Sequence, residues 1–159
     1  MLVMAPHLTQ AGNDKEQVEP MLARIKALPQ GLDQPDQLLA DTGFFSERNV
    51  YCCQSAGIEP LIAVGRDQHH PDWRGRFEEP TPLEQPATHV AQMRHTLKTW
   101  AGRAAYALRK RTVEPVFGII KSVMGFRQFM LRGLDNARNK CTLVCLAWNL
   151  KRMAVLRPQ

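Results

Sequence analysis

The sequence lacks the features that would place it in or across a membrane. No run of 18 apolar residues occurs among its 159 residues, which excludes an ordinary membrane-spanning helix. The first residues also lack the basic start and long apolar stretch of a signal peptide. We therefore expect one cytoplasmic protein, long enough for a single domain with a core and with no membrane partner.

Acidic residues are scarce in the last third of the sequence. Residues 101–159 contain 12 Lys and Arg against 2 Asp and Glu, whereas residues 1–100 contain 9 against 13. The net charge of +6 therefore combines −4 in the first part with +10 in the second. This concentration of positive charge favours binding to a polyanion such as nucleic acid. The alternative interpretation is a basic face that only water covers.

Cysteine is sparse and does not follow a zinc-binding pattern. The pair Cys52-Cys53 is adjacent, and Cys141 and Cys145 lie four apart on a predicted helix. Without His or Cys partners at zinc spacing, we expect buried, reduced thiols. The pair His69-His70 is interpreted as part of a loop because no periodicity surrounds it.

Residues 1–65 have the pattern of an α/β unit. Strands and helices are expected to alternate, in the order strand, helix, strand, helix, strand, at residues 2–8, 15–28, 37–41, 47–56 and 59–65. This order favours parallel strands with right-handed crossovers. Pro20 lies inside the first predicted helix and is expected to kink or restart it.

The remaining chain is predicted to be a loop followed by helices. Prolines and charges mark residues 66–86 as an exposed loop or insertion, and residues 87–159 as a helical C-terminal portion. Within that portion we expect a break at Ala101-Gly102 and a long final helix that ends near Ala154. Its apolar side is predicted to comprise Leu143, Val144, Leu146, Ala147, Leu150 and Met153.

Two carboxylates stand out by position. Asp41 ends a predicted strand, and ligands gather at the carboxyl ends of parallel strands. Glu114 precedes Pro115, which predicts that it lies at a kink or at a helix N-terminus. Each acid alone has a simpler interpretation, Asp41 as a turn residue and Glu114 as an ion-pair partner of Arg109, Lys110 or Arg111.

Taken together, the two acids carry a family resemblance. The segments LADTGFFSERNV at 39–50 and RKRTVEPVFGIIK at 109–121 resemble the second and third acidic motifs of the DDE transposases of bacterial insertion sequences. Shorter matches include the Gly57-Ile58 turn, Gly125-Phe-Arg127 and Leu146-Ala-Trp-Asn-Leu150. The resemblance covers most of the chain.

The resemblance implies an RNase H-like fold in which three acids hold two Mg²⁺ ions for DNA strand cleavage and joining. Asp41 would be the second acid and Glu114 the third, both as catalytic and metal-binding residues. The implied DNA contacts are Tyr106, Arg109, Lys110, Arg111 and Lys121. Tyr106 and Arg109 lie one residue further from Glu114 than the commonest family spacing, and Lys121 lies two helical turns after it.

One part of the family pattern is absent. The first acid belongs on a strand upstream of residues 2–8, and Asp14, which follows that segment as a helix cap, has no motif to support it as a replacement. The sequence therefore predicts an incomplete RNase H-like fold, with a short, mostly parallel sheet, flanking helices and an all-helical C-terminal half. We expect the C-terminal part of a transposase catalytic domain that is inactive alone. The alternatives are a basic DNA-binding protein that joins or interferes with an intact transposase or with its own copies, and an α/β protein whose basic helices only face solvent.

Overall fold

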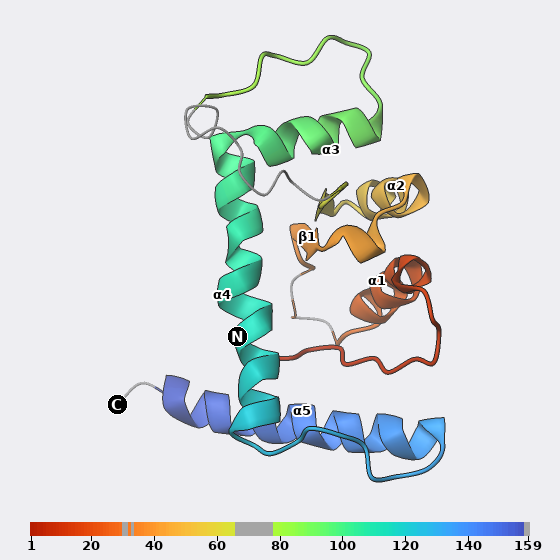
Figure 1. Cartoon of the computed structure of the whole chain (residues 1–159), viewed down its shortest axis with the longest axis vertical. Helices are drawn as coiled ribbons and strands as arrows, with labels where there is room; N and C mark the ends of the chain where they lie inside the picture. Colours follow the sequence, from red (N-terminus) through yellow and green to blue (C-terminus); the bar gives the residue numbers. More distant parts are fainter. Residues whose placement is uncertain (30–31, 33, 66–77, 158–159) are drawn as a thin grey trace. The chain divides into compact units, whose positions relative to one another are not determined.

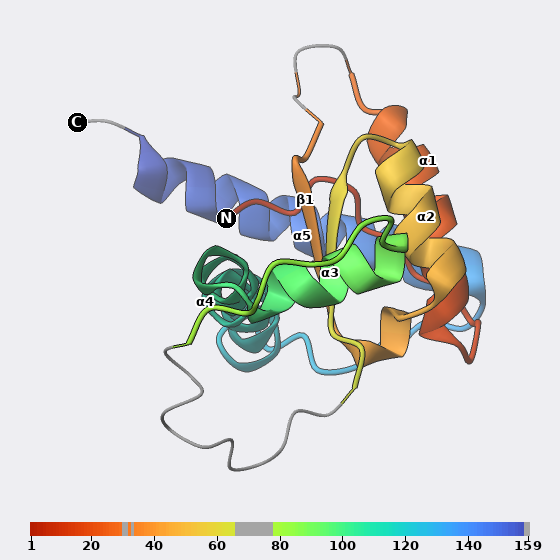
Figure 2. The same ribbon diagram turned by 90° about the horizontal axis from the view of Figure 1, so that it is seen from above.

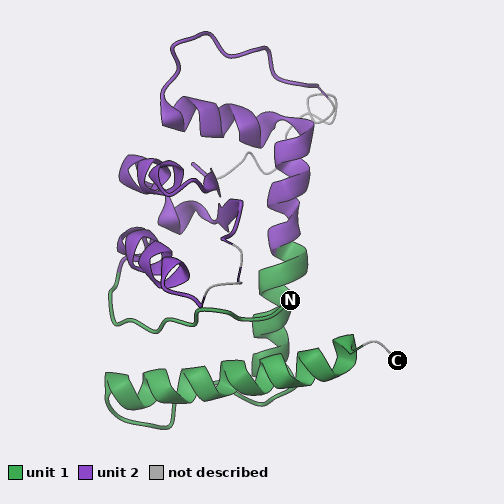
Figure 3. Ribbon diagram, turned by 180° about the vertical axis from the view of Figure 1, so that it is seen from behind, with its two compact units in different colours: residues 1–12, 110–159 green, residues 13–109 purple. Residues whose placement is uncertain are grey.

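The computed structural model describes residues 1–29, 32, 34–65 and 78–157 (Figure 1). The chain forms two compact units, one of residues 13–109 and the other of residues 1–12 with 110–159 (Figure 3). Each unit is described by itself. The sequence-based division at 65 and 86 stays a prediction, and His69-His70 lies outside the described residues.

The unit of residues 13–109 contains a two-stranded parallel sheet. Strand β1, Gln37–Ala40, pairs with β2, Glu59–Ile62, with Leu39 opposite Leu61. Helices α2, Glu47–Ser55, and α3, His89–Lys98, both contact β2 (Figure 2). The parallel pair and the helical C-terminal half confirm the mixed α/β prediction in these respects.

The core of this unit lies between the sheet and its helices. Val50 of α2, Ile62 of β2 and Met93 of α3 are buried together. Cys53, one turn after Asn49 on α2, is also buried, and burial raises the pKa of its thiol to about 11. The cysteines of the described chain are free thiols, as predicted, and the raised pKa makes Cys53 a poor nucleophile at neutral pH.

The first helical segment of the unit begins differently from the prediction. A 3-10 turn, η1, spans Asp14–Gln17, and α1 follows at Val18–Lys26. Asn13 caps η1 by accepting a hydrogen bond from the Lys15 N–H at 3.0 Å. Pro20 therefore lies in the first turn of α1, where its missing N–H costs no helical hydrogen bond.

The expected break at Ala101-Gly102 is wrong by two residues. Helix α3 ends at Lys98, Thr99 has extended backbone, and α4 begins at Trp100 and runs to Ser122. A Cβ at Gly102 would lie 1.9 Å from the Thr96 carbonyl oxygen, so this position needs glycine for close approach of the two helices.

Helix α4 also corrects the expectation for Glu114, because Pro115 does not start a new helix. The helix continues through the proline, and Glu114 is an exposed residue of its interior. A proline can be accommodated inside a long helix at the cost of one hydrogen bond when the flanking turns are stabilised by packing. The next turn supplies that packing, since Val116 and Ile120 are buried.

The unit of residues 1–12 and 110–159 is built on α5, Leu134–Leu156. Trp148 of α5 packs with Val116 and Ile120 of α4 in its core. Val144 of the predicted apolar side of α5 packs against this core, whereas most of the large side chains on that side are more than half exposed: Leu143 62%, Leu146 51%, Leu150 59% and Met153 55%. The adjacent face carries the larger indole of Trp148, which buries more apolar area than a leucine.

Residues 2–8 do not form the predicted strand. Their backbone is instead held along α5 by side chains. The Asn149 carboxamide accepts a hydrogen bond from the Val3 N–H at 2.8 Å and donates one to the Val3 carbonyl at 2.7 Å. Arg138 donates to the Leu8 carbonyl at 3.0 Å, and the Trp148 indole donates to the Met1 carbonyl at 3.2 Å.

The spacing of these contacts shows why the segment is extended. From Asn149 to Arg138 the helix rises about 16 Å, and from Val3 to Leu8 an extended chain covers about the same length. The segment therefore runs antiparallel to α5. Asn149 satisfies both polar groups of Val3, as a neighbouring strand would. Among the described residues, no helix is long and apolar enough to cross a membrane.

We predict that Asn149→Ala destabilises this unit by about 1–3 kcal/mol, because Val3 loses two hydrogen bonds at a half-buried position. Urea denaturation followed by tryptophan fluorescence measures the change, since Trp148 adjoins the contact. Asn139→Ala on the exposed side of the same helix is the control and is expected to change stability by less than about 0.5 kcal/mol. Equal effects of the two substitutions would contradict the role of Asn149.

Candidate functional site

Asp41 occupies the turn that directly follows β1. It is the N-cap of a short 3-10 helix, η2, at Thr42–Phe44, and its Oδ1 accepts a hydrogen bond from the Gly43 N–H at 3.1 Å. Aspartate followed two residues later by glycine favours this kind of turn, because the carboxylate satisfies a local N–H. The Asp41 side chain is 54% exposed, so its carboxylate is accessible to solvent and ligands.

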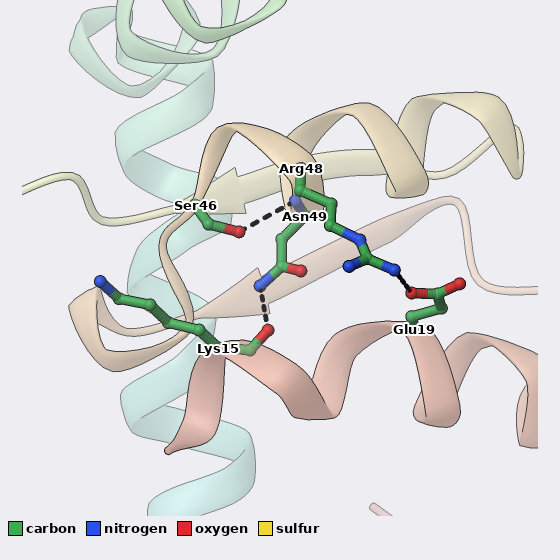
Figure 4. Close-up of polar contacts among 5 residues, drawn as sticks. All are labelled: Lys15, Glu19, Ser46, Arg48 and Asn49. Atoms are coloured by element: carbon green, nitrogen blue, oxygen red, sulfur yellow. Dashed lines mark hydrogen bonds and ion pairs between the residues drawn. The ribbon is translucent and has the colours of Figure 1, made fainter.

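A buried amide holds this turn in place. Asn49 is 3% exposed, and its Nδ2 donates a hydrogen bond to the Lys15 carbonyl oxygen at 2.8 Å (Figure 4). It donates a second one to the Phe44 carbonyl oxygen at 2.7 Å. The Ser46 hydroxyl accepts from the Asn49 N–H at 3.1 Å and so caps α2. Asn49 thereby joins α2 to η1 on one side and to the Asp41 turn on the other.

The same contact brings Asp14 beside Asp41. A Cβ at Gly43 would lie 3.1 Å from Asp14 Oδ2 and 3.2 Å from Asp41 Oδ1. Both carboxylates therefore border the small space that the absent side chain of Gly43 leaves. Two carboxylates that face one space repel each other, and a cation would relieve that repulsion.

A cation of the protein already lies close to Asp41. Arg109 Nη1 is 3.7 Å from Asp41 Oδ2, and the Arg109 guanidinium lies 5.5 Å from the centre of the Tyr106 ring. Arg109 is therefore an ion-pair partner of Asp41. Tyr106 and Arg109, two predicted DNA contacts, thus lie in the neighbourhood of Asp41.

The other candidates lie on α4 in the unit of residues 110–159. Their side chains are exposed: Lys110, Arg111, Glu114 and Lys121. Glu114 and Lys121 are separated by two helical turns and so project from the same side of α4, about 10 Å apart along its axis. Gly118 lies between them on that side, and a Cβ there would meet no atom within 4 Å. The side of α4 that carries Glu114 is therefore open.

The described residues contain no cluster of candidate metal ligands. No group of three or more His, Cys, Asp or Glu is placed to hold one ion in the described part of the chain. The oxygens of Asp41 and Asp14 are nevertheless ligands of the kind that Mg²⁺ accepts. The metal role of Asp41 and Glu114 stays a prediction.

Asn49 was not identified as a site residue from the sequence. A signal exists in the pattern, because Asn49, Val50 and Cys53 form the inward side of α2 at helical spacing. An amide on the buried side of a helix must find hydrogen-bond partners. Turns that pack against the helix offer backbone carbonyl groups that are not already used in a helix or sheet. Which turns they are depends on tertiary packing, which the local sequence does not specify.

Replacing Asn49 should disturb the Asp41 turn. We predict that Asn49→Ala lowers the free energy of unfolding by about 1–3 kcal/mol, because two partly buried carbonyl groups lose their donor. It should also speed hydrogen exchange at the Gly43 amide. Arg48→Ala removes only the exposed ion pair with Glu19 and should cost less than about 1 kcal/mol. The interpretation fails if Gly43 exchange is unchanged in Asn49→Ala.

Comparison with known protein families identifies a match for part of this chain. Residues 81–154 match the family described as the transposase DDE domain. The matched segment contains Glu114 together with the predicted DNA contacts, whereas Asp41 and Asp14 lie outside it. No curated protein and no solved structure matches the chain significantly. The resemblance seen in the sequence is thus confirmed for the part that carries α3, α4 and most of α5, because residues 81–154 match the transposase DDE domain family.

Proposed function

We propose that this chain is a DNA-binding part of a transposase catalytic domain, and that Asp41 and Glu114 are two of its metal-binding acids. The observation that carries the proposal is the family match over residues 81–154. Glu114 has the motif Arg-Thr-Val-Glu-Pro around it within that match. Asp41 is assigned by its motif and by its exposed carboxylate at the end of β1.

The fold we propose for the sheet is RNase H-like. Two parallel strands whose connection contains a helix, with further helices packed on them, are the expected pieces of such a fold. The candidate acid follows the first strand of the pair, at the edge where α/β proteins bind their ligands.

DNA is the proposed partner of the basic helices. Residues 101–159 carry a charge of +10, and most of the cations named as DNA contacts are exposed on α4. The open side of α4 around Gly118 would let a phosphodiester approach between Glu114 and Lys121. Lys121 would then hold a phosphate beside the Glu114 carboxylate.

Mg²⁺ is the proposed cofactor, with Asp41 and Glu114 as the residues that would hold it. The bound ions would polarise the phosphodiester and stabilise its leaving oxygen. Hard carboxylate oxygens fit that ion, and Arg109 beside Asp41 would hold the carboxylate in place before an ion binds. Because the motifs supply two acids and not three, we propose that the chain as it stands binds DNA but does not cut it.

A second function is favoured by the exposed side of α5. Leu143, Leu146, Leu150 and Met153 recur at alternating spacings of three and four, which is the pattern of a helix that packs against another helix. This row favours the alternative that the chain binds DNA and also associates with an intact transposase, with which it would interfere. Inhibition of strand transfer by the added chain, lost in Leu146→Ser, would support it.

DNA binding can be tested with matched charge variants. We predict that Lys110→Ala, Arg111→Ala and Lys121→Ala together weaken duplex binding at least tenfold and lower the slope of log Kd against log salt by about 3. The measurement is fluorescence anisotropy of a labelled duplex at several salt concentrations. Lys26→Ala, Arg94→Ala and Lys98→Ala, also two Lys and one Arg, are exposed residues of the other unit and form the control.

The control triple should lower the affinity and the slope much less. Binding without salt dependence, or equal losses in the two triple variants, would contradict the proposed DNA interface. Cleavage or joining of DNA by the chain with Mg²⁺ or Mn²⁺, abolished by Glu114→Gln, would contradict the proposed inactivity.

A further inference from the structure

A hollow lies between the end of α4 and the start of α5, outside the residues already assigned. Its volume is about 580 Å³, within the usual range of small-molecule sites. It is lined by Phe126, Arg127, Gln128, Met130, Leu131 and, from α5, Lys140. Gly125, with φ +70°, makes the turn that directs this loop away from α4.

The two cations of the hollow have no acidic neighbour. No Asp or Glu occurs between Glu114 and Asp135 in the sequence. In the part of the chain that the structure describes, the ion pair of Asp135 is with Arg138, and no carboxylate lies within ion-pair distance of Arg127 or Lys140. The hollow therefore has a positive potential that favours an anion.

The same loop exposes large apolar side chains. Met130 is 82% exposed, Leu131 is 49% exposed and Phe129 is 39% exposed. Phe126 is anchored below them, since it packs on the core of α4 and α5 and meets the Phe129 ring edge-on at a centroid distance of 5.1 Å. Exposed apolar groups gathered in one loop indicate a contact surface.

We propose that the loop 125–132 and Lys140 form a binding site for an unpaired nucleotide of DNA. Arg127 and Lys140 hold a phosphate, while the base rests on the apolar side chains of the loop. Cations beside stacking or wedging apolar groups are the combination that single strands and unstacked bases require. A paired duplex keeps the faces of its bases stacked on one another, so the apolar side chains of the loop find no base face to stack on.

The site deepens the proposed DNA-binding function and depends on it for its biological substrate, but its residues are separate from those on α4. An anionic lipid surface also combines negative charge with apolar groups. The concave form of the site, bordered by the loop and by Lys140 of α5, and the family match that covers it both favour the nucleotide.

Fluorescence anisotropy with a labelled 12-mer of dT and a duplex of the same length tests the site. Arg127→Ala with Lys140→Ala should weaken binding of the single strand about tenfold or more and of the duplex less than threefold. Lys151→Ala with Arg152→Ala removes one Lys and one Arg elsewhere on α5 and is the charge-matched control. Equal losses of single-strand binding in the two double variants would overturn the proposal.

An uncharged variant separates stacking from charge. Met130→Ser changes a side chain that is 82% exposed, so it should fold normally and still weaken single-strand binding about threefold or more. Val155→Ser, on a side chain of α5 that is 69% exposed, should leave that binding unchanged. Unchanged binding in Met130→Ser, or binding to phosphatidylserine vesicles in place of dT, would overturn the nucleotide assignment.

The two DNA proposals fail in distinguishable ways. Loss of duplex binding in the Lys110, Arg111 and Lys121 triple variant supports the α4 interface and does not test the nucleotide site. If that triple variant binds duplex normally while Met130→Ser loses the single strand, the nucleotide site stands and the α4 interface does not.

Discussion

The hydrogen bonds of one buried amide organise the part of the fold that carries Asp41. Asn49 Nδ2 reaches the carbonyl oxygens of Lys15 and Phe44, which belong to two different 3-10 turns. Leaving those partly buried carbonyl groups without a donor is unfavourable, so the two turns are held together by Asn49. Asp41 then projects from a turn with little freedom, which is the condition for a carboxylate that must bind an ion or a substrate at a fixed place.

A second amide performs the same kind of task in the other unit. Asn149 bonds to both polar groups of Val3, and Trp148 packs against Val116 and Ile120 on α4. Helix α4, which carries Glu114, is thereby packed against α5, and Asn149 of α5 is itself hydrogen-bonded to Val3. Both candidate acids are consequently exposed at their carboxylates but lie on elements anchored by buried neighbours, a combination expected of functional groups on a rigid scaffold.

The sequence predicted what depends on local patterns. The strand before Asp41, the helix capped by Ser46 and the long final helix follow from apolar periodicity and capping residues. It failed where tertiary packing decides the outcome. Residues 2–8 are apolar enough for a strand, but the backbone of Val3 is hydrogen-bonded to a side chain and not to another strand. Helix α4 continues through Pro115 because Val116 and Ile120 are buried. The roles of Asp41 and Glu114 came from motifs, whereas Asn49 and the loop beyond Gly125 became visible only through contacts.

We propose that Asp41 and Glu114 are both metal-binding acids. Mn²⁺ titration followed by electron paramagnetic resonance tests it in the chain itself, in Asp41→Asn, in Glu114→Gln and in the double variant. If both acids are metal ligands, each single substitution weakens Mn²⁺ binding about tenfold or more, and the double variant binds no more tightly than either single variant. Glu84→Gln, an exposed acid elsewhere, should have no effect. An Mn²⁺ affinity that is unchanged in either single variant would contradict the metal role of that acid.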